Sequence, residues 1–264
     1  MANQKLTSNL SRFFAGMVIV LAVIIGHLIY YLVLGDKANF DAEGHPKAGN
    51  ILGIMYKGGF IVPILLALLI TVITIGIERF ITIQRAKGKG SIDLFVKKIK
   101  GMLASGQIDT AINECDNQKG SLANVMKCGL QRYKDVHNDS SMDKEAKEAA
   151  IQKELEEATA LELPMLSQNL PILSTAASIG TLIGLIGTVF GMIRAFAALA
   201  TAGQPDTAAL ATGISEALVN TAVGIVSSTF AIIFYNVFAT KIDALTYSMD
   251  EAGFSIMQTL KSQG

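Results

Sequence analysis

The run GTLIGLIGTVFG at residues 180–191 lies within about 31 consecutive uncharged residues, from Leu163 to Ile193. On a helix, with about 100° between successive residues, its glycines fall within about 60° of one another. They are Gly180, Gly184, Gly187 and Gly191. Glycine lowers helix stability, but in lipid it lets two backbones approach closely. The run therefore predicts a membrane-spanning helix that packs tightly against a second helix.

Three other segments are long and apolar enough to cross the hydrocarbon core, which needs about 20 residues of helix. They run from Phe13 to Leu34, from Gly58 to Ile77, and from about Ile214 to Thr240. Hydrophobic residues make up 51% of the chain and charged residues only 17%, an excess that a soluble core does not need. We predict an all-α, polytopic membrane protein with four transmembrane helices. The first segment is long for a signal peptide and lacks a small-x-small cleavage site, which favours a retained anchor.

The distribution of lysine and arginine predicts the orientation of these spans. Lys5 and Arg12 precede the first span, and a basic cluster follows the second between Arg79 and Lys100. Because basic residues favour the cytosolic side, we expect both termini in the cytosol. The expected parts are an N-terminal anchor and external loop (1–57), a second span (58–83), a cytosolic helical domain (84–162), a pore-forming helix pair joined by an external turn at 202–212 (163–240), and a cytosolic C-terminal helix (241–264).

Helical patterns continue outside the membrane. Residues 142–163 are rich in Ala, Glu, Lys and Leu, which favour helix. We expect them to run on into the third span as one helix of about 50 residues, kinked at Pro164 and Pro171. In the C-terminal segment, apolar residues recur at three- and four-residue steps, which predicts a packing face. These residues are Ile242, Leu245, Met249, Ala252 and Ile256.

The fourth span carries a polar arc. Its members within about 80° of one another are Glu216, Asn220, Gly224 and Ser227, and Thr221 and Ser228 extend the arc to about 140°. A carboxylate on a spanning helix costs about 2.5–3.5 kcal/mol at the bilayer centre, so it is a functional-site hypothesis by default. The alternative is that Glu216 lies in the headgroup region and only snorkels. We expect the polar side to face protein or water and the opposite side to face lipid.

Hydroxyl groups on the two glycine-bearing helices add to this arc. Threonine both donates and accepts hydrogen bonds, so Thr188 and Thr221 are suited to hold water or a protonatable group. The alternative for any single threonine is a hydrogen bond to its own helix. The sequence predicts a proton pathway lined by Thr188, Thr221, Glu216 and Asn220. It predicts helix packing at the four glycines of the 180–191 run and at Gly224.

Other function classes lack support. The 22 basic residues balance the 22 acidic ones, which gives no electrostatic footprint for nucleic acid. The three histidines are scattered, and Cys115 and Cys128 have no metal-ligand spacing, so they are expected to be reduced thiols. With no catalytic constellation visible, the chain is predicted not to be an enzyme and to hold no metal or cofactor.

Two segments resemble the signature membrane helices of the ExbB/TolQ/MotA proton-channel family. They are IGTVFGMIRAF at residues 186–196 and GISEALVNTAVG at residues 213–224. Tyr235-Asn236 and the segment GQIDTAINEC at residues 106–115 extend the resemblance over about residues 58–260. The first span lies outside the three-helix pattern of ExbB and TolQ, and four spans are the count of MotA. The acid in Ser-Glu-Ala-Leu resembles ExbB and TolQ more than MotA, which makes ExbB the closest member by this comparison.

The resemblance implies a pentamer around the membrane helices of a single-span partner of the ExbD or TolR type, whose aspartate takes up and releases the proton. Thr188, Thr221 and Glu216 then correspond to pore-facing residues, whereas Asn220 stands where the family more commonly has a small apolar residue. The implied function is an inner-membrane motor subunit that uses the proton motive force, with a TonB-like protein, to energise transport across an outer membrane. The alternatives are a TolQ-like envelope subunit, a MotA-like motility stator and, from another class, a single-chain secondary transporter, which would be expected to show inverted repeats.

Overall fold

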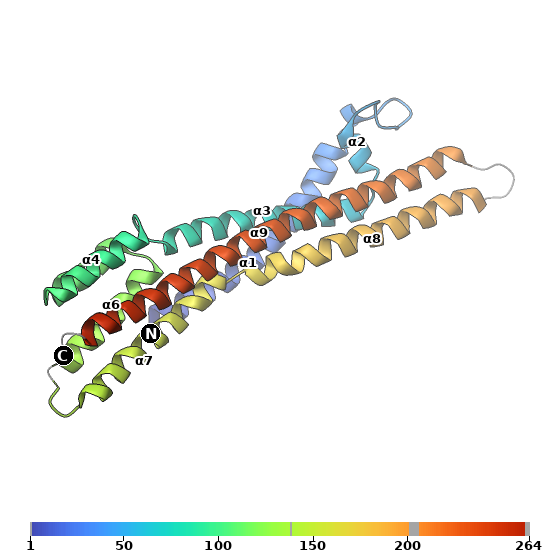
Figure 1. The fold of residues 1–264 in the computed structure, drawn as a ribbon. Helices are drawn as coiled ribbons and strands as arrows, with labels where there is room; N and C mark the ends of the chain where they lie inside the picture. The colour runs from blue at the N-terminus through green and yellow to red at the C-terminus, as the bar shows by residue number, and fades with distance from the viewer. Residues whose placement is uncertain (1, 138, 201–205, 262–264) are drawn as a thin grey trace. The chain divides into compact units, whose positions relative to one another are not determined.

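The computed structural model describes residues 2–137, 139–200 and 206–261 (Figure 1). It is 85% helical, and none of the described residues forms a strand. Four helical segments have the length and hydropathy to cross a membrane: Phe13–Leu34, Ile61–Ala86, Lys144–Ala200 and Thr207–Thr259. The predicted fold class, an all-α membrane protein with four spanning helices, is therefore confirmed.

The chain divides into two compact units, and the first comprises Met1–Glu78 and Asn169–Asn236. We call it the membrane unit because it holds most of the apolar helical residues. Its elements are α1 (Ala2–Leu28), the π-helical turn η1 (Ile29–Leu34), the 3₁₀ turn η2 (Lys37–Asn39), α2 (Ile51–Tyr56), most of α3 (Ile61–Ala86), α8 (Leu170–Ala200) and the first part of α9 (Thr207–Lys261). Within this unit α8 and α9 run side by side (Figure 1).

The loop between α1 and α3 is held by side-chain amides. Asn39 is buried, and its Nδ2 donates to the carbonyl oxygens of Val33 (2.7 Å) and Leu34 (3.1 Å). Asn50 donates to Asn39 Oδ1 (3.1 Å), and its own Oδ1 accepts from the Gly53 N–H at the start of α2 (3.0 Å). An Asn at this N-cap position satisfies a helix donor that would otherwise lack a partner. The loop is thereby fixed against the end of the first span.

The second unit comprises Arg79–Gln168 and Val237–Gly264. It contains α4 (Ile92–Ala104), α5 (Ile108–Gln118), α6 (Ser121–His137), α7 (Lys144–Ser167) and the last part of α9. Each of α4, α5 and α6 packs on the next helix in the chain. The apolar residues predicted to form the packing face of the C-terminal helix are all buried: Ile242, Leu245, Met249, Ala252 and Ile256. Cys115 and Cys128 are free thiols, and burial raises the pKa of Cys115 from 9.0 to about 12.

Several helix ends differ from the predictions. The single helix expected from residue 142 into the third span is broken after Ser167, where Asn169 has a positive φ of 64°. Pro164 stays inside α7, and Pro171 lies in the first turn of α8, where its missing N–H costs nothing. The C-terminal helix is a continuation of α9 and not a separate element. Residues 202–205 of the predicted 202–212 turn lie outside the described residues, and α9 has already begun at Thr207.

Candidate functional site

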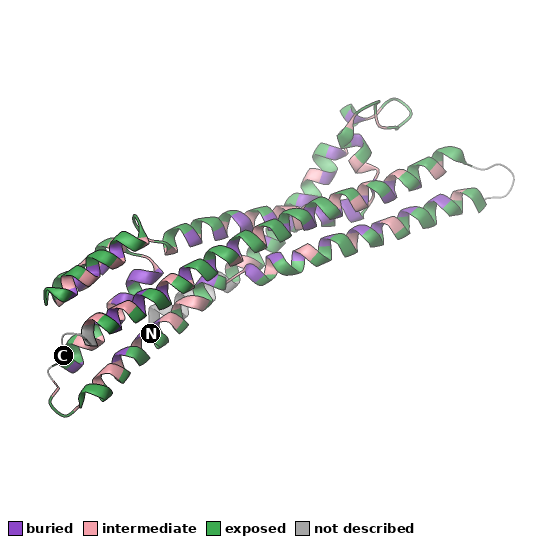
Figure 2. Cartoon of the chain, in the orientation of Figure 1, coloured by how far each residue is buried: buried purple, intermediate pink, exposed green. Residues whose placement is uncertain are grey.

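The centre of the membrane unit is a close seam between α8 and α9. All four glycines of the 180–191 run are buried, and buried residues recur turn by turn along α8 (Figure 2). A Cβ on Gly191 would lie 2.7 Å from the Gly213 carbonyl oxygen and 2.7 Å from the Ala217 nitrogen. At Gly184 a Cβ would lie 3.1 Å from the Asn220 carbonyl oxygen. These partners are backbone atoms, which cannot move aside, so the seam requires glycine on α8.

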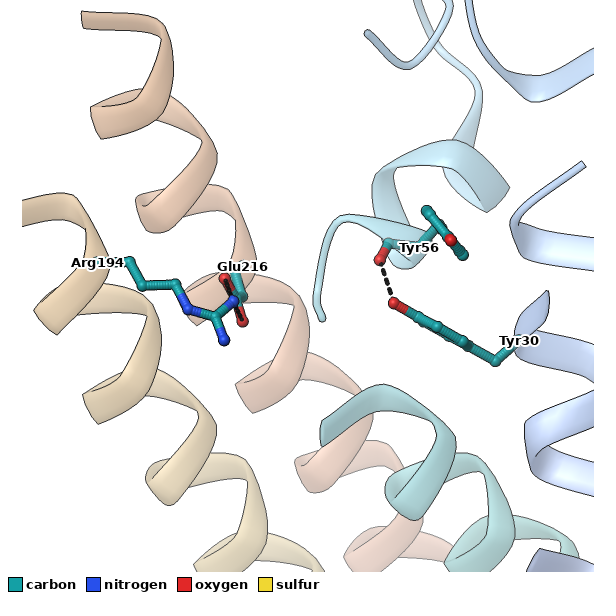
Figure 3. Close-up of polar contacts among 4 residues, drawn as sticks. All are labelled: Tyr30, Tyr56, Arg194 and Glu216. Atoms are coloured by element: carbon teal, nitrogen blue, oxygen red, sulfur yellow. Dashed lines mark hydrogen bonds and ion pairs between the residues drawn. The ribbon is translucent and has the colours of Figure 1, made fainter. Parts of the chain in front are cut away.

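An ion pair lies beside this seam. Arg194 Nη1 donates to both carboxylate oxygens of Glu216, at 2.7 Å each (Figure 3). The Glu216 side chain is 3% exposed and that of Arg194 is 52% exposed. The guanidinium carbon of Arg194 also lies 5.9 Å from the centre of the Phe60 ring, within reach of a cation–π interaction. Glu216 is therefore a buried acid with an ionic partner and not a side chain that extends to solvent.

The segment before α3 covers this acid. Gly59 has a φ of 75°, and a Cβ built there would overlap Glu216 Oε1 and lie 3.0 Å from Glu216 Cδ. The missing side chain thus lets the backbone rest directly on the carboxylate, in a conformation that glycine adopts without strain. Phe60, the next residue, packs edge-on against Phe190 of α8, with ring centres 5.6 Å apart. The start of α3 is in this way fixed to the α8–α9 pair.

Asn220 occupies the seam itself. It is fully buried, and a Cβ on Gly187 would lie 2.7 Å from its Cγ and 2.8 Å from its Nδ2. Within the part of the chain that the structure describes, neither Nδ2 nor Oδ1 of Asn220 has a hydrogen-bond partner. An unsatisfied buried polar group of this kind costs about 1–3 kcal/mol. The Asn220 amide therefore has hydrogen-bonding capacity left for water or another polar group inside the seam.

The two threonines lie away from the ion pair. Thr188 Oγ1 donates to the Leu185 carbonyl oxygen (2.6 Å), and Thr221 Oγ1 donates to that of Ala217 (3.2 Å), so both bond to their own helices. At about 100° per residue, Thr221 is about 140° from Glu216 around α9, and Thr188 is about 120° from Arg194 around α8. The threonines are half-buried on one side of the seam, the ion pair is on the other, and Asn220 lies between.

Thr188 borders an open apolar surface on α8 that it shares with Val189, Met192, Ile193 and Phe196. On the same side of the seam, Thr181 Oγ1 donates to Ser228 Oγ across the two helices (3.0 Å). The face of α9 that was predicted to meet lipid is largely exposed in the single chain, including Leu218 and Ile225. The threonine side of the seam is therefore the side that is open to a neighbouring molecule.

The geometry of the pair would allow proton binding by Glu216 to affect the position of the Arg194 side chain. While Glu216 is ionised, its bonds to Arg194 are charge-assisted, and such bonds are roughly twice as strong as neutral ones. A proton on the carboxyl group would remove that charge assistance and leave the Phe60 ring as the remaining contact of the Arg194 guanidinium described above. The sequence-based reasoning missed Arg194, which follows the third span by one residue, and it missed Gly59 altogether. The sequence did carry a signal for the ion pair: Arg194 is a base at the end of one span, and Glu216 is an acid near the start of the next. Antiparallel packing of the two helices brings both residues to the same depth in the membrane.

Comparison with protein families gives a match to the model of the MotA/TolQ/ExbB proton channel family over residues 117–251, a little over half of the chain. The matched segment contains α8, the described start of α9, and both partners of the ion pair. A comparison with curated proteins gave no match.

Proposed function

The chain belongs to the MotA/TolQ/ExbB proton channel family, and on that basis we propose that it is the proton-channel subunit of an inner-membrane motor. The observation that carries the proposal is Glu216, an acid that is 3% exposed on a membrane-spanning helix and bound to Arg194 at 2.7 Å. Ionisable groups are expensive within a membrane and are retained where they serve a pathway for ions or protons. In this proposal Glu216 takes up a proton on the pathway, and the side chain of Arg194 changes position when the ion pair is lost.

We propose that the pathway is lined by Thr188 and Thr221 on the open side of the seam, with Asn220 as the link to Glu216. Support comes from the unsatisfied amide of Asn220, which lies between the threonines and the acid around α9. Buried waters typically make about three hydrogen bonds to polar groups of this kind. Water held by Asn220 would connect the hydroxyl groups to the carboxyl group across the seam.

The open apolar surface beside Thr188 supports an oligomer. We propose a homo-oligomer, a pentamer by family resemblance, that surrounds an ExbD/TolR-like single-span partner. The partner supplies the aspartate that takes up and releases the proton, since the four spans predicted from the sequence contain none. We propose that both termini, residues 84–162 and residues 241–264 lie in the cytosol and that residues 35–57 lie outside.

Within the family we favour an ExbB-like role, in which the motor works with a TonB-like protein to energise transport across an outer membrane. The Ser-Glu-Ala-Leu segment around Glu216 supports this choice over a MotA-like stator. A TolQ-like envelope role is the second candidate, because TolQ shares that acid. Neighbouring genes separate the two: ExbD and TonB homologues favour the first role, and TolR and Pal homologues the second. A single-chain secondary transporter is disfavoured, because such proteins carry their substrate site at an interface between repeats.

The test is a substitution that removes a hydroxyl group and nearly keeps the shape. Cells that lack the wild-type chain receive a Thr188→Val/Thr221→Val variant, and TonB-dependent uptake of a ferric siderophore is measured. Thr229→Val is the matched control, because Thr229 also bonds to its own helix (Oγ1 to the Ile225 carbonyl oxygen, 2.8 Å) but is exposed. We expect the double variant to abolish uptake and the control to retain it. Equal uptake by both, with both assembled in the membrane, would refute the pathway.

A further inference from the structure

The segment Tyr56–Phe60, which we call the 56–60 turn, is the part of the chain that closes over Glu216. Gly59 rests on the carboxylate as described above, and a Cβ on Gly58 would lie 2.8 Å from Val219 Cγ1 on α9. The Gly58 N–H donates to the Met55 carbonyl oxygen (3.0 Å) and the Gly59 N–H to that of Tyr56 (3.2 Å). The turn is therefore bonded backward to the end of α2 and touches α9 through two residues without side chains.

Tyr30, from the end of the first span, holds this turn from the other side. Its hydroxyl donates to the Tyr56 carbonyl oxygen at 3.0 Å, the same oxygen that accepts from Gly59 (Figure 3). The two tyrosine rings are stacked, with centroids 4.7 Å apart and planes 22° apart. One carbonyl group thus joins the first span to the residue that lies on Glu216.

The position of Tyr30 is itself fixed. Its side chain is buried and packs with Leu34 and Val62, and Val219 of α9 borders the same cluster. It lies in the π-helical turn Ile29–Leu34, a widened backbone of the kind that often occurs at functional sites. Gly35 ends this turn, and a Cβ there would lie 2.7 Å from Tyr56 Cε2. The Tyr56 ring is therefore held between Tyr30 and the backbone after the first span.

We propose that Tyr30 is a positioning residue for Glu216: through the Tyr56 carbonyl it holds the 56–60 turn closed over the carboxylate and keeps water on the loop side from reaching it. The cover is built from residues before position 117, outside the segment that matches the family. Its significance for proton transfer rests on the proposed function, because a motor that couples proton flow to movement must keep an acid on the pathway from opening to both sides at once. The existence of the cover does not depend on that function.

The first experiment removes only the hydroxyl group. Hydrogen–deuterium exchange of the full chain in detergent is followed for peptides that contain the 56–60 turn, in the wild type and in Tyr30→Phe. Loss of one hydrogen bond predicts roughly fivefold faster exchange of the Gly58 and Gly59 amides. Tyr31→Phe is the control, because Tyr31 is the neighbouring tyrosine and is 62% exposed. Faster exchange in Tyr30→Phe alone supports the proposal, and unchanged exchange overturns it.

A second measurement asks whether the cover protects the carboxyl group. A water-soluble carbodiimide with glycine ethyl ester modifies carboxyl groups that water can reach, and the adduct at Glu216 is counted by peptide mass spectrometry. Tyr30→Phe and Gly59→Ala are expected to raise this labelling several-fold. Gly49→Ala is the matched control for the second variant, because Gly49 has the same backbone (φ 76°) with no atom within 4 Å of an added Cβ.

Equal labelling of Glu216 in all variants would overturn the cover, whatever the transport activity. Transport lost or retained by Tyr30→Phe bears instead on the proposed function, so the two proposals can fail separately.

Discussion

The Arg194–Glu216 pair makes an asymmetric prediction, because its two members differ in exposure. Arg194→Gln leaves behind a carboxylate that is 3% exposed, whereas Glu216→Gln leaves a guanidinium that is 52% exposed. Breaking a buried pair from one side typically costs about 3–5 kcal/mol, whereas losing an exposed one costs about 0–1 kcal/mol. The stranded carboxylate can escape by taking up a proton, which at pH 7 requires about 3.7 kcal/mol for an ordinary glutamate. We therefore expect Arg194→Gln to lower the free energy of unfolding by about 3 kcal/mol and Glu216→Gln by about 1 kcal/mol or less.

The assay is SDS-induced unfolding in mixed micelles, followed by far-UV circular dichroism at pH 7 and pH 5. Protonation of a carboxyl group becomes easier by about 1.4 kcal/mol for each pH unit lowered, so the deficit of Arg194→Gln should shrink to about 1 kcal/mol at pH 5. The Arg194→Gln/Glu216→Gln double variant has no buried charge to strand and should recover most of the loss, which gives a coupling of about 2 kcal/mol. Equal single-variant losses that add in the double variant, with no dependence on pH, would refute the reasoning.

Further predictions concern the seam, the second unit and the topology. Gly191→Ala should destabilise the membrane unit by about 1–3 kcal/mol, because the new Cβ meets α9 backbone. Gly16→Ala, within helix α1 and with open space around it, should cause no destabilisation in the same unfolding assay. Because burial raises the pKa of Cys115 to about 12, the folded form holds the thiol proton more tightly than the unfolded form. Stability should then fall above about pH 9 by about 1.4 kcal/mol per pH unit, and the fall should be absent from Cys115→Ala. A cysteine placed by His45→Cys should react with an impermeant maleimide from outside intact cells, and labelling only from the cytosolic side would contradict the proposed orientation.

Hydropathy identified the spans because it measures what lipid tolerates, and each of the four predicted spans overlaps a long helical segment of the structure. It could not set the helix ends, which depend on backbone hydrogen bonds. The helix α9 continues to Lys261 because the residues after the span also favour helix, and α3 begins only at Ile61 because of the turn at Gly59. Helical periodicity placed the α8 glycines on one face, since that face follows from the 3.6-residue repeat alone.

The arrangement around Glu216 could not be predicted in the same way. Periodicity gives the direction of a side chain around its own helix but not which neighbour it meets. Hydroxyl chemistry and family resemblance grouped Glu216 with Thr188 and Thr221, whereas packing places Glu216 against Arg194 and Gly59 on the other side of the seam. Contacts that join residues far apart in sequence, such as Tyr30 to Tyr56 and Gly59 to Glu216, need the tertiary structure.

Proton flux is the most direct test of the proposed channel. The chain is purified together with the proposed single-span partner and reconstituted into lipid vesicles that contain a pH-sensitive dye, and a potassium diffusion potential is imposed. We predict acidification of the lumen by the wild type and by Thr229→Val, and flux at least tenfold lower for Glu216→Gln and for Thr188→Val/Thr221→Val. Undiminished flux in both of the latter variants, each assembled with the partner, would contradict the proposal that protons cross the membrane along this seam.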